Sequence, residues 1–211
     1  MKLTIINYGS GNLHSVHKAF EKVNSIIGSP YNITVTSNPL EINESDKIVL
    51  PGVGAFNQCK NSLLDINNLY ETLEDKVIQK KIPFMGICVG MQLLANKAYE
   101  FGNHNGFGWI EGEVVKLNTK ETFQVPHMGW NEVCFENHPL FTNCKQGTDF
   151  YFVHSFHFQA AKKENVLATT NYSETITAAV INENIFGTQF HPEKSHENGK
   201  KIIENFLDWK P

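Results

Sequence analysis

The first half of the chain alternates short apolar runs with stretches of helical periodicity. Residues 3–8 form an apolar run that ends at a glycine turn, and apolar residues then recur at helical spacing from Leu13 to Val23. Further apolar runs, with helical patterns between them, lie at 33–36, 47–50 and 83–87. Strands that alternate with helices indicate a parallel sheet covered by helices on both faces.

Beyond about residue 105, β-branched and aromatic runs separated by turn residues predict mostly strands, with antiparallel pairing. These runs lie at 113–117, 131–135, 149–158, 165–170 and 175–181. Residues 89–98 have helical composition, and a last helix is expected to start near Ser195. The pattern predicts an α/β fold: one three-layer domain over residues 1–211, with a mixed, mostly parallel central sheet flanked by helices.

Composition excludes several classes of function. The 211 residues are 41% hydrophobic and 19% charged with a net charge of −4, so no basic excess indicates nucleic-acid binding. No apolar run is long enough to span a membrane, and the first segment reaches Asn7 before a signal-peptide core could form. We therefore expect a cytoplasmic protein, with no nucleic acid and no membrane among its partners.

Cysteine and histidine spacing gives no metal signature. The four cysteines lack C-x-x-C pairing, so disulfides and zinc binding are not expected in a reducing compartment. The nine histidines form no H-E-x-x-H pattern. We expect neither a metal nor a cofactor.

One cysteine lies in a suggestive setting, the sequence GICVG at residues 86–90. A cysteine between two glycines, where a strand meets a helix, is typical of a nucleophile elbow. A helix N-terminus there favours the thiolate of Cys88, and the Val89 N–H is oriented toward a developing oxyanion. The alternative is a tight glycine turn in which Cys88 only packs.

A thiol that attacks an amide needs a base and a proton donor. His191 ends an apolar run in the sequence FHPEK, and Glu193 follows two residues later. In an extended chain these two side chains point the same way, so Glu193 can orient the imidazole of His191. A surface turn is the alternative interpretation of this sequence taken alone.

The sequence PGVG at residues 51–54 directly follows the apolar run 47–50. Glycines on both sides of Val53 allow unusual peptide orientations, which suits a backbone N–H that must point at an oxyanion. The alternative is a simple turn at a strand end. A phosphate loop is not indicated, because no G-K-[ST] follows.

Taken together, these motifs resemble the class I, triad-type glutamine amidotransferases in order and approximate spacing. VPHMGWN at 125–131, YFVHSF at 151–156 and YGSGNLHSV at 8–16 are similar to the glutaminase subunits of imidazole glycerol phosphate synthase within that family. The similarity covers nearly the whole chain.

The resemblance implies a Cys88–His191–Glu193 triad that hydrolyses L-glutamine through a glutamyl thioester and releases ammonia. It also implies that backbone N–H groups of Val53 and Val89 hold the oxyanion. The positions that match those binding the glutamine α-amino and α-carboxylate groups in the family are Gly54, Gln92, Glu100, Ser155 and Phe156. Glu100 can pair with an ammonium and Gln92 can donate to a carboxylate, although an ordinary helix position and a solvated helix end remain alternatives for Gln92 and Glu100.

The chain departs from the family pattern at Asn7, where an aspartate is common, so any ion pair made by that aspartate is in doubt. The chain also contains no recognisable machinery to accept ammonia. The resemblance implies that a (β/α)8-barrel cyclase of histidine biosynthesis accepts it within a heterodimer. Asn12, Tyr151 and Lys194 match the docking face of the family, though Lys194 also suits a solvated surface position.

Three alternatives remain open from the sequence. A paralogous glutaminase could supply ammonia to a partner in surface-sugar biosynthesis. A non-catalytic regulatory subunit could have kept the fold, although the complete triad argues against this. A cysteine hydrolase of peptides is the third, and the Gln92 and Glu100 pair favours a free amino acid instead.

Overall fold

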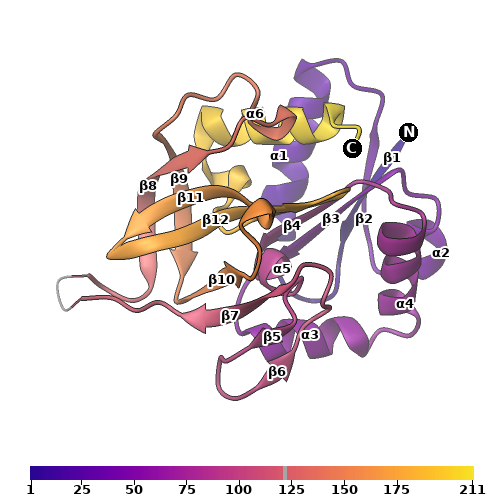
Figure 1. The fold of residues 1–211 in the computed structure, drawn as a ribbon. Helices are drawn as coiled ribbons and strands as arrows, with labels where there is room; N and C mark the ends of the chain where they lie inside the picture. The colour runs from indigo at the N-terminus through magenta and orange to yellow at the C-terminus, as the bar shows by residue number, and fades with distance from the viewer. Residues whose placement is uncertain (121–122) are drawn as a thin grey trace.

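The computed structural model describes residues 1–120 and 123–211, and a nine-stranded mixed sheet runs through it in the order β2-β1-β3-β4-β13-β12-β11-β8-β9 (Figure 1). The parallel half consists of β1 (Lys2–Ile6), β2 (Asn32–Thr36), β3 (Lys47–Gly52), β4 (Phe84–Cys88) and β13 (Ile185–Thr188). The antiparallel half adds β8 (His127–Phe135), β9 (Thr148–His154), β11 (Val166–Tyr172) and β12 (Glu174–Asn182). Every residue of β3 and β4 is buried, as expected for parallel strands covered on both faces.

Helices cover both faces of the parallel half (Figure 1). They are α1 (Leu13–Ile26), α2 (Pro39–Ile42), α3 (Phe56–Leu64), α4 (Leu69–Glu74), α5 (Val89–Gln92) and α6 (His196–Asp208). Short turns of other helix types span Asp75–Gln79, Pro139–Phe141, Lys163–Asn165 and Pro192–Lys194. Helices α1 and α6 pack together on one face, where Phe20 meets Phe206 edge-on at 6.4 Å, and α3 and α4 lie on the other face.

The predicted α/β class, with a mixed central sheet between helices, is confirmed. Parallel pairing extends from β2 to β13, and the remaining pairings are antiparallel, so each kind occupies one side of the sheet. One contiguous core cluster links both halves, which suits the expectation of one domain over residues 1–211; that expectation stays a prediction.

The aromatic run 149–158 forms two strands where the sequence suggested one. Strand β9 joins the large sheet, whereas β10 (Phe156–Ala160) joins a small sheet with β7 (Gly112–Lys116), β5 (Lys97–Ala98) and β6 (His104–Asn105). The chain changes sheet at Ser155, whose carbonyl accepts a hydrogen bond from Leu117 N–H. Ser155 and Phe156 therefore lie at the junction between the two sheets.

The prediction of a helix through residues 89–98 is wrong beyond Gln92, because α5 ends there. The carbonyls of Leu93 and Ala95, which would continue the helix, instead accept hydrogen bonds from the backbone N–H groups of Phe107 and Gly108. A distant loop has thus replaced the local helical hydrogen bonds, a change that local composition does not reveal.

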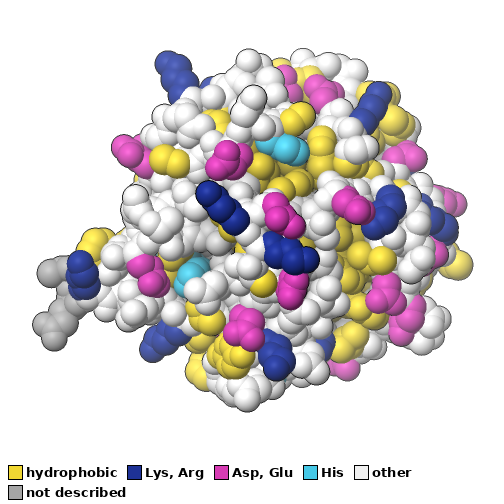
Figure 2. Space-filling model, viewed as in Figure 1, with side chains coloured by type: hydrophobic (Ala, Val, Ile, Leu, Met, Phe, Trp, Pro, Cys, Tyr) yellow, Lys and Arg dark blue, Asp and Glu magenta, His cyan; other side chains and the backbone are white. Residues whose placement is uncertain are grey.

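Acidic and basic side chains are interspersed over the face drawn in Figure 2, in keeping with the small net charge. Among the described residues, no helix is both long enough and apolar enough to cross a membrane. No group of three or more histidine, cysteine, aspartate or glutamate side chains in the described part of the chain could hold a metal ion.

Candidate active site

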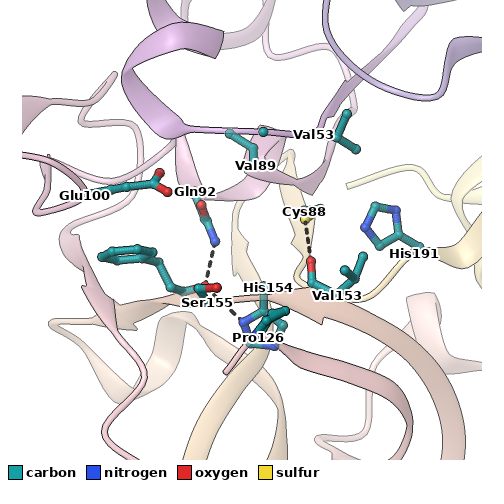
Figure 3. A pocket seen from close by; sticks show the side chains of 12 residues that line it. Val53, Cys88, Val89, Gln92, Glu100, Pro126, Val153, His154, Ser155 and His191 are labelled. Atoms are coloured by element: carbon teal, nitrogen blue, oxygen red, sulfur yellow. Dashed lines mark hydrogen bonds between the residues drawn. The ribbon is translucent and has the colours of Figure 1, made fainter. Parts of the chain in front are cut away.

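The ends of β3 and β4 open into a cavity of about 240 Å³ (Figure 3). Nine of the residues singled out in the sequence line it: Val53, Gly54, Cys88, Val89, Gln92, Glu100, Ser155, Phe156 and His191. They come from both halves of the large sheet and from the small sheet. The fold thus brings together motifs that are up to about 140 residues apart in the chain.

Cys88 lies at the junction of β4 and α5 in a strained backbone conformation, with φ 55° and ψ −110°. Such a conformation costs roughly 1–3 kcal/mol for a non-glycine residue, so the surrounding packing must impose it. The two flanking glycines provide the room. A Cβ at Gly90 would lie 1.9 Å from the Leu50 carbonyl oxygen, and one at Gly86 would lie 2.5 Å from the Gly90 oxygen.

His191 and Glu193 form a buried pair beside Cys88. Nδ1 of His191 is 2.8 Å from Oε1 of Glu193, and both side chains are 2% exposed. The pairing arises because Pro192–Lys194 forms a 3₁₀ turn, and not because the chain is extended as the sequence suggested. Nε2 of His191 has no hydrogen-bond partner among the described residues, and it remains available to Cys88.

The charge state of His191 follows from its neighbours. Burial lowers the pKa of the imidazole, but the adjacent Cys88 sulfur and the Glu193 carboxylate outweigh burial and raise the pKa to about 10. The site therefore favours an imidazolium at His191, held by a carboxylate on one side and facing the cysteine on the other.

The two backbone N–H groups expected at an oxyanion are in different situations. Val89 is the first residue of α5, where N–H groups have no partner within the helix. The Val53 N–H instead donates to Ser10 Oγ at 3.2 Å, and the Ser10 hydroxyl donates to the Val53 carbonyl at 2.7 Å. The peptide of Val53 is thus bound to the first loop of the chain.

Gln92 is placed by hydrogen bonds from its amide nitrogen. Nε2 donates to the Phe156 carbonyl at 2.8 Å and to Oε1 of Gln189 at 3.0 Å, which uses both of its hydrogens. Its own Oε1 remains an acceptor. Glu100 is fixed in a similar way, because its Oε2 accepts a hydrogen bond of 2.7 Å from Phe56 N–H at the start of α3.

A pair of buried histidines behind the cavity was not singled out in the sequence. His154, which lines the cavity, has Nδ1 3.0 Å from the Phe156 carbonyl and Nε2 3.0 Å from Nδ1 of His127. A carbonyl only accepts, so His154 carries its proton on Nδ1, and His127 donates to Nε2. No local sequence pattern identifies this pair, because it forms across β8 and β9.

The residues expected at a docking face lie outside the cavity. Lys194 Nζ sits 5.6 Å from the centre of the Tyr151 ring, and the Tyr151 carbonyl accepts the His191 N–H. Asn12 caps the start of α1, which packs against the Pro192–Lys194 turn. Asn7 accepts a long hydrogen bond from Gly9 N–H, so it supports a local turn.

The fold and the site together define a class of α/β enzyme in which a cysteine sits on a strand-to-helix elbow beside a histidine–glutamate pair. The family model of the glutamine amidotransferase class-I family matches residues 4–209. Solved structures share the fold: a glutamine amidotransferase from Thermotoga maritima superposes with a TM-score of 0.66 at 18% identity, covering 99% of this chain and 83% of that one. Another solved glutamine amidotransferase has a TM-score of 0.72 at 13% identity, covering 97% of each chain.

Sequence relatives are much more similar. The imidazole glycerol phosphate synthase subunit HisH of Agrobacterium fabrum is 45% identical over the full length of both chains. HisH of Pelagibacter ubique is 46% identical over 99% of this chain and all of that protein. The chain therefore belongs to the glutamine amidotransferase class-I family and, within it, to the HisH subunits of imidazole glycerol phosphate synthase.

Proposed function

We propose that the chain hydrolyses L-glutamine to glutamate and ammonia through Cys88, His191 and Glu193. The observation that carries this proposal is the strained elbow of Cys88 opening into the same small cavity as the buried His191–Glu193 pair. A thiolate, an imidazolium and a carboxylate in that order are the components of nucleophilic amide cleavage.

In the first half of the reaction the Cys88 thiolate attacks the side-chain carbonyl carbon of glutamine. The tetrahedral oxyanion is held by the Val89 N–H, and by the Val53 N–H once it leaves Ser10. His191 gives its proton to the leaving nitrogen, ammonia departs and a glutamyl thioester remains. One oxyanion donor is typically worth roughly 10²–10³ in rate, so the position of the Val53 peptide controls activity.

In the second half His191 removes a proton from water, and the resulting hydroxide attacks the thioester. The carbon–sulfur bond breaks, glutamate leaves and the cysteine returns to its starting state. Glu193 keeps the imidazole oriented through both proton transfers. The overall change is one water consumed and one ammonia released for each glutamine.

The cavity suits a free amino acid. Because both amide hydrogens of Gln92 are engaged, its Oε1 and the Glu100 carboxylate offer acceptors to the glutamine α-ammonium. The Gln92 assignment thereby changes from carboxylate donor to ammonium acceptor. The α-carboxylate is then left to Gly54, Ser155 and Phe156, which line the same cavity.

The partner we propose is a (β/α)8-barrel cyclase, which takes the ammonia and forms imidazole glycerol phosphate and aminoimidazole carboxamide ribotide in the cytoplasm. The relatives are named as subunits of imidazole glycerol phosphate synthase. Beside Tyr151 and Lys194, Met128 and Trp130 are 62% and 47% exposed, and large side chains of this kind are enriched at interfaces. The docking face therefore combines Asn12, Tyr151 and Lys194 with this apolar pair.

The test of the nucleophile is Cys88→Ala, with the exposed Cys134→Ala as the matched control. Glutamate release in the presence of the barrel cyclase should disappear in Cys88→Ala, whereas Cys134→Ala retains it. Binding of Cys88→Ala to the barrel cyclase, measured by calorimetry, should be unchanged. Glutamine hydrolysis that persists in Cys88→Ala would contradict the proposed mechanism.

Two measurements test the partner. Glutamine hydrolysis should rise strongly when the barrel cyclase and its nucleotide ligand are added, and a rate indifferent to them would contradict a coupled enzyme. The gene for this chain should restore growth without histidine to cells that lack their own glutaminase subunit. Failure to complement, with the protein expressed and active, would favour a surface-sugar partner.

A further inference from the structure

Gln189 is a fully buried glutamine that the mechanism above does not use. It follows β13 and precedes His191 by two residues, and its side chain contacts residues of the site. Its Nε2 lies 3.7 Å from Sγ of Cys88, and its Oε1 accepts the hydrogen bond from Gln92. One side chain thus joins the cysteine to a residue of the substrate pocket.

The neighbouring hydrogen bonds fix which end of the Gln189 amide faces the sulfur. The Phe156 carbonyl can only accept, so Gln92 must direct its Nε2 toward it, and the same nitrogen faces Gln189. Gln189 must therefore present its oxygen to Gln92. In the reverse orientation two NH₂ groups would face each other, and an amide oxygen would lie against the cysteine sulfur.

We propose that Gln189 is a further catalytic residue, whose amide N–H donates a hydrogen bond to the Cys88 sulfur and favours the reactive thiolate. This inference rests on the proposed role of Cys88 as the nucleophile. Because Cys88 is only 4% exposed, water cannot supply this hydrogen bond freely, and a donor to an ionised group is stronger than one between neutral groups.

The chemistry of an amide suits this position. A glutamine side chain does not ionise, so it stabilises the thiolate without competing for the proton that His191 transfers. His191 approaches Cys88 as an imidazolium, and Gln189 adds a neutral donor to the same sulfur. The weak contact from Cys88 Sγ to the Val153 carbonyl, at 3.9 Å, is available only to the protonated thiol.

Two substitutions separate the two contacts of Gln189. Gln189→Glu keeps an oxygen that accepts from Gln92 but removes the donor to sulfur. Gln189→Met keeps the side-chain length and removes both contacts. We therefore expect both variants to lower kcat, and Gln189→Met also to raise KM for glutamine, because Gln92 then loses one of its two anchors.

The experiment measures the rate at which iodoacetamide alkylates Cys88 in the full chain, followed by mass spectrometry of the Cys88 peptide. Near neutral pH both variants should react roughly tenfold more slowly at Cys88 than the wild type, the effect expected of one lost hydrogen bond to a charged group. The exposed Cys134 serves as an internal reference, whose alkylation rate should be the same in the variants as in the wild type.

Gln146→Met is the matched control, because the Gln146 amide also uses both its oxygen and its nitrogen in hydrogen bonds, in this case to the Phe135 backbone at an exposed position. It should leave Cys88 alkylation unchanged. If folded Gln189→Glu and Gln189→Met react at Cys88 as fast as the wild type near neutral pH, Gln189 only packs and the proposal is overturned.

A measurement that leaves Gln189 intact covers the case in which neither variant folds. The side-chain NH₂ resonances of Gln189 should shift when Cys88 is replaced by alanine, since their acceptor is removed; unchanged resonances would overturn the proposal. These readouts do not require turnover. Activity retained in Cys88→Ala would contradict the proposed function, whereas unaltered alkylation in the Gln189 variants would contradict this inference alone.

Discussion

At the scale of single residues, the site depends on backbone groups that side chains hold in position. Cys88 keeps an unfavourable φ because β4 and α5 are packed through Gly86 and Gly90. The Val53 peptide is bound by the Ser10 hydroxyl, which both accepts from its N–H and donates to its carbonyl. A residue in the first loop thereby controls one of the two proposed oxyanion donors.

Replacing Ser10 by alanine should release the Val53 N–H. Because one oxyanion donor is worth roughly 10²–10³ in rate, we expect glutaminase activity without the partner to rise about tenfold or more. Steady-state glutamate production by the isolated chain measures this. Ser10→Thr, which keeps the hydroxyl, is the control and should stay at the wild-type rate; an unaltered rate in Ser10→Ala would show that the Ser10 hydroxyl does not limit the donor.

At the scale of elements, the Pro192–Lys194 turn, which carries Glu193, is held between α6 and the large sheet. Ser195 ends the Pro192–Lys194 turn, and its hydroxyl donates to the His191 carbonyl and accepts from Tyr151 N–H on β9. At the other end of α6, buried Lys47 on β3 donates to the carbonyls of Phe206 and Trp209. Burial of the Lys47 ammonium group lowers its pKa to about 8.

Lys47→Met should weaken the docking of α6. The methionine fills a similar length but leaves two buried carbonyls without a donor, each costing roughly 1–3 kcal/mol, and removing a buried charge offsets part of that cost. We expect the free energy of unfolding to fall by about 2 kcal/mol, measured by urea denaturation at neutral pH. Lys18→Met, at an exposed position of α1, should change the free energy of unfolding very little. Equal stability of the two variants would show that the Lys47 hydrogen bonds do not stabilise the docking of α6.

At the scale of the whole molecule, the free energy of unfolding should depend on pH because of the buried histidine pair, His127 and His154. Burial lowers the pKa of His127 to about 4, and burial together with His127 lowers the pKa of His154 to about 3. Both histidines are thus neutral in the folded protein at pH values where the unfolded chain binds protons, below about 6.5. The unfolded state then binds more protons, so stability is lost as the pH falls.

We expect the free energy of unfolding to decrease between about pH 6.5 and pH 5, by up to about 1.4 kcal/mol per pH unit for each histidine. His191 adds little in this range, because its raised pKa keeps it protonated when folded. Urea denaturation across the range, comparing wild type with His127→Gln and the exposed His14→Gln, measures the slope. The plot of unfolding free energy against pH should be less steep in His127→Gln than in His14→Gln. Equal slopes in the two variants would contradict the assignment.

Much of the fold could be predicted because the signals are local. The apolar runs of β1, β3 and β4 and the helical stripe of α1 are read directly from residue spacing, since strands and helices repeat with different periods. The end of α5, the division of 149–158 between two sheets and the His127–His154 pair could not be predicted. Each depends on hydrogen bonds between segments far apart in the sequence, which no local pattern records.

The sequence by itself determined the alternation of strands and helices, the family and the motifs around Cys88, Val53 and His191, because these are encoded in residue type and spacing. Tertiary structure alone decided how those residues are used. It set the peptide of Val53 against Ser10, turned the Gln92 amide so that only its oxygen stays available, and brought Gln189 to the Cys88 sulfur. The physical reason is that the direction of each hydrogen bond depends on which donors and acceptors lie close together. The packing of the two sheets determines which groups are close.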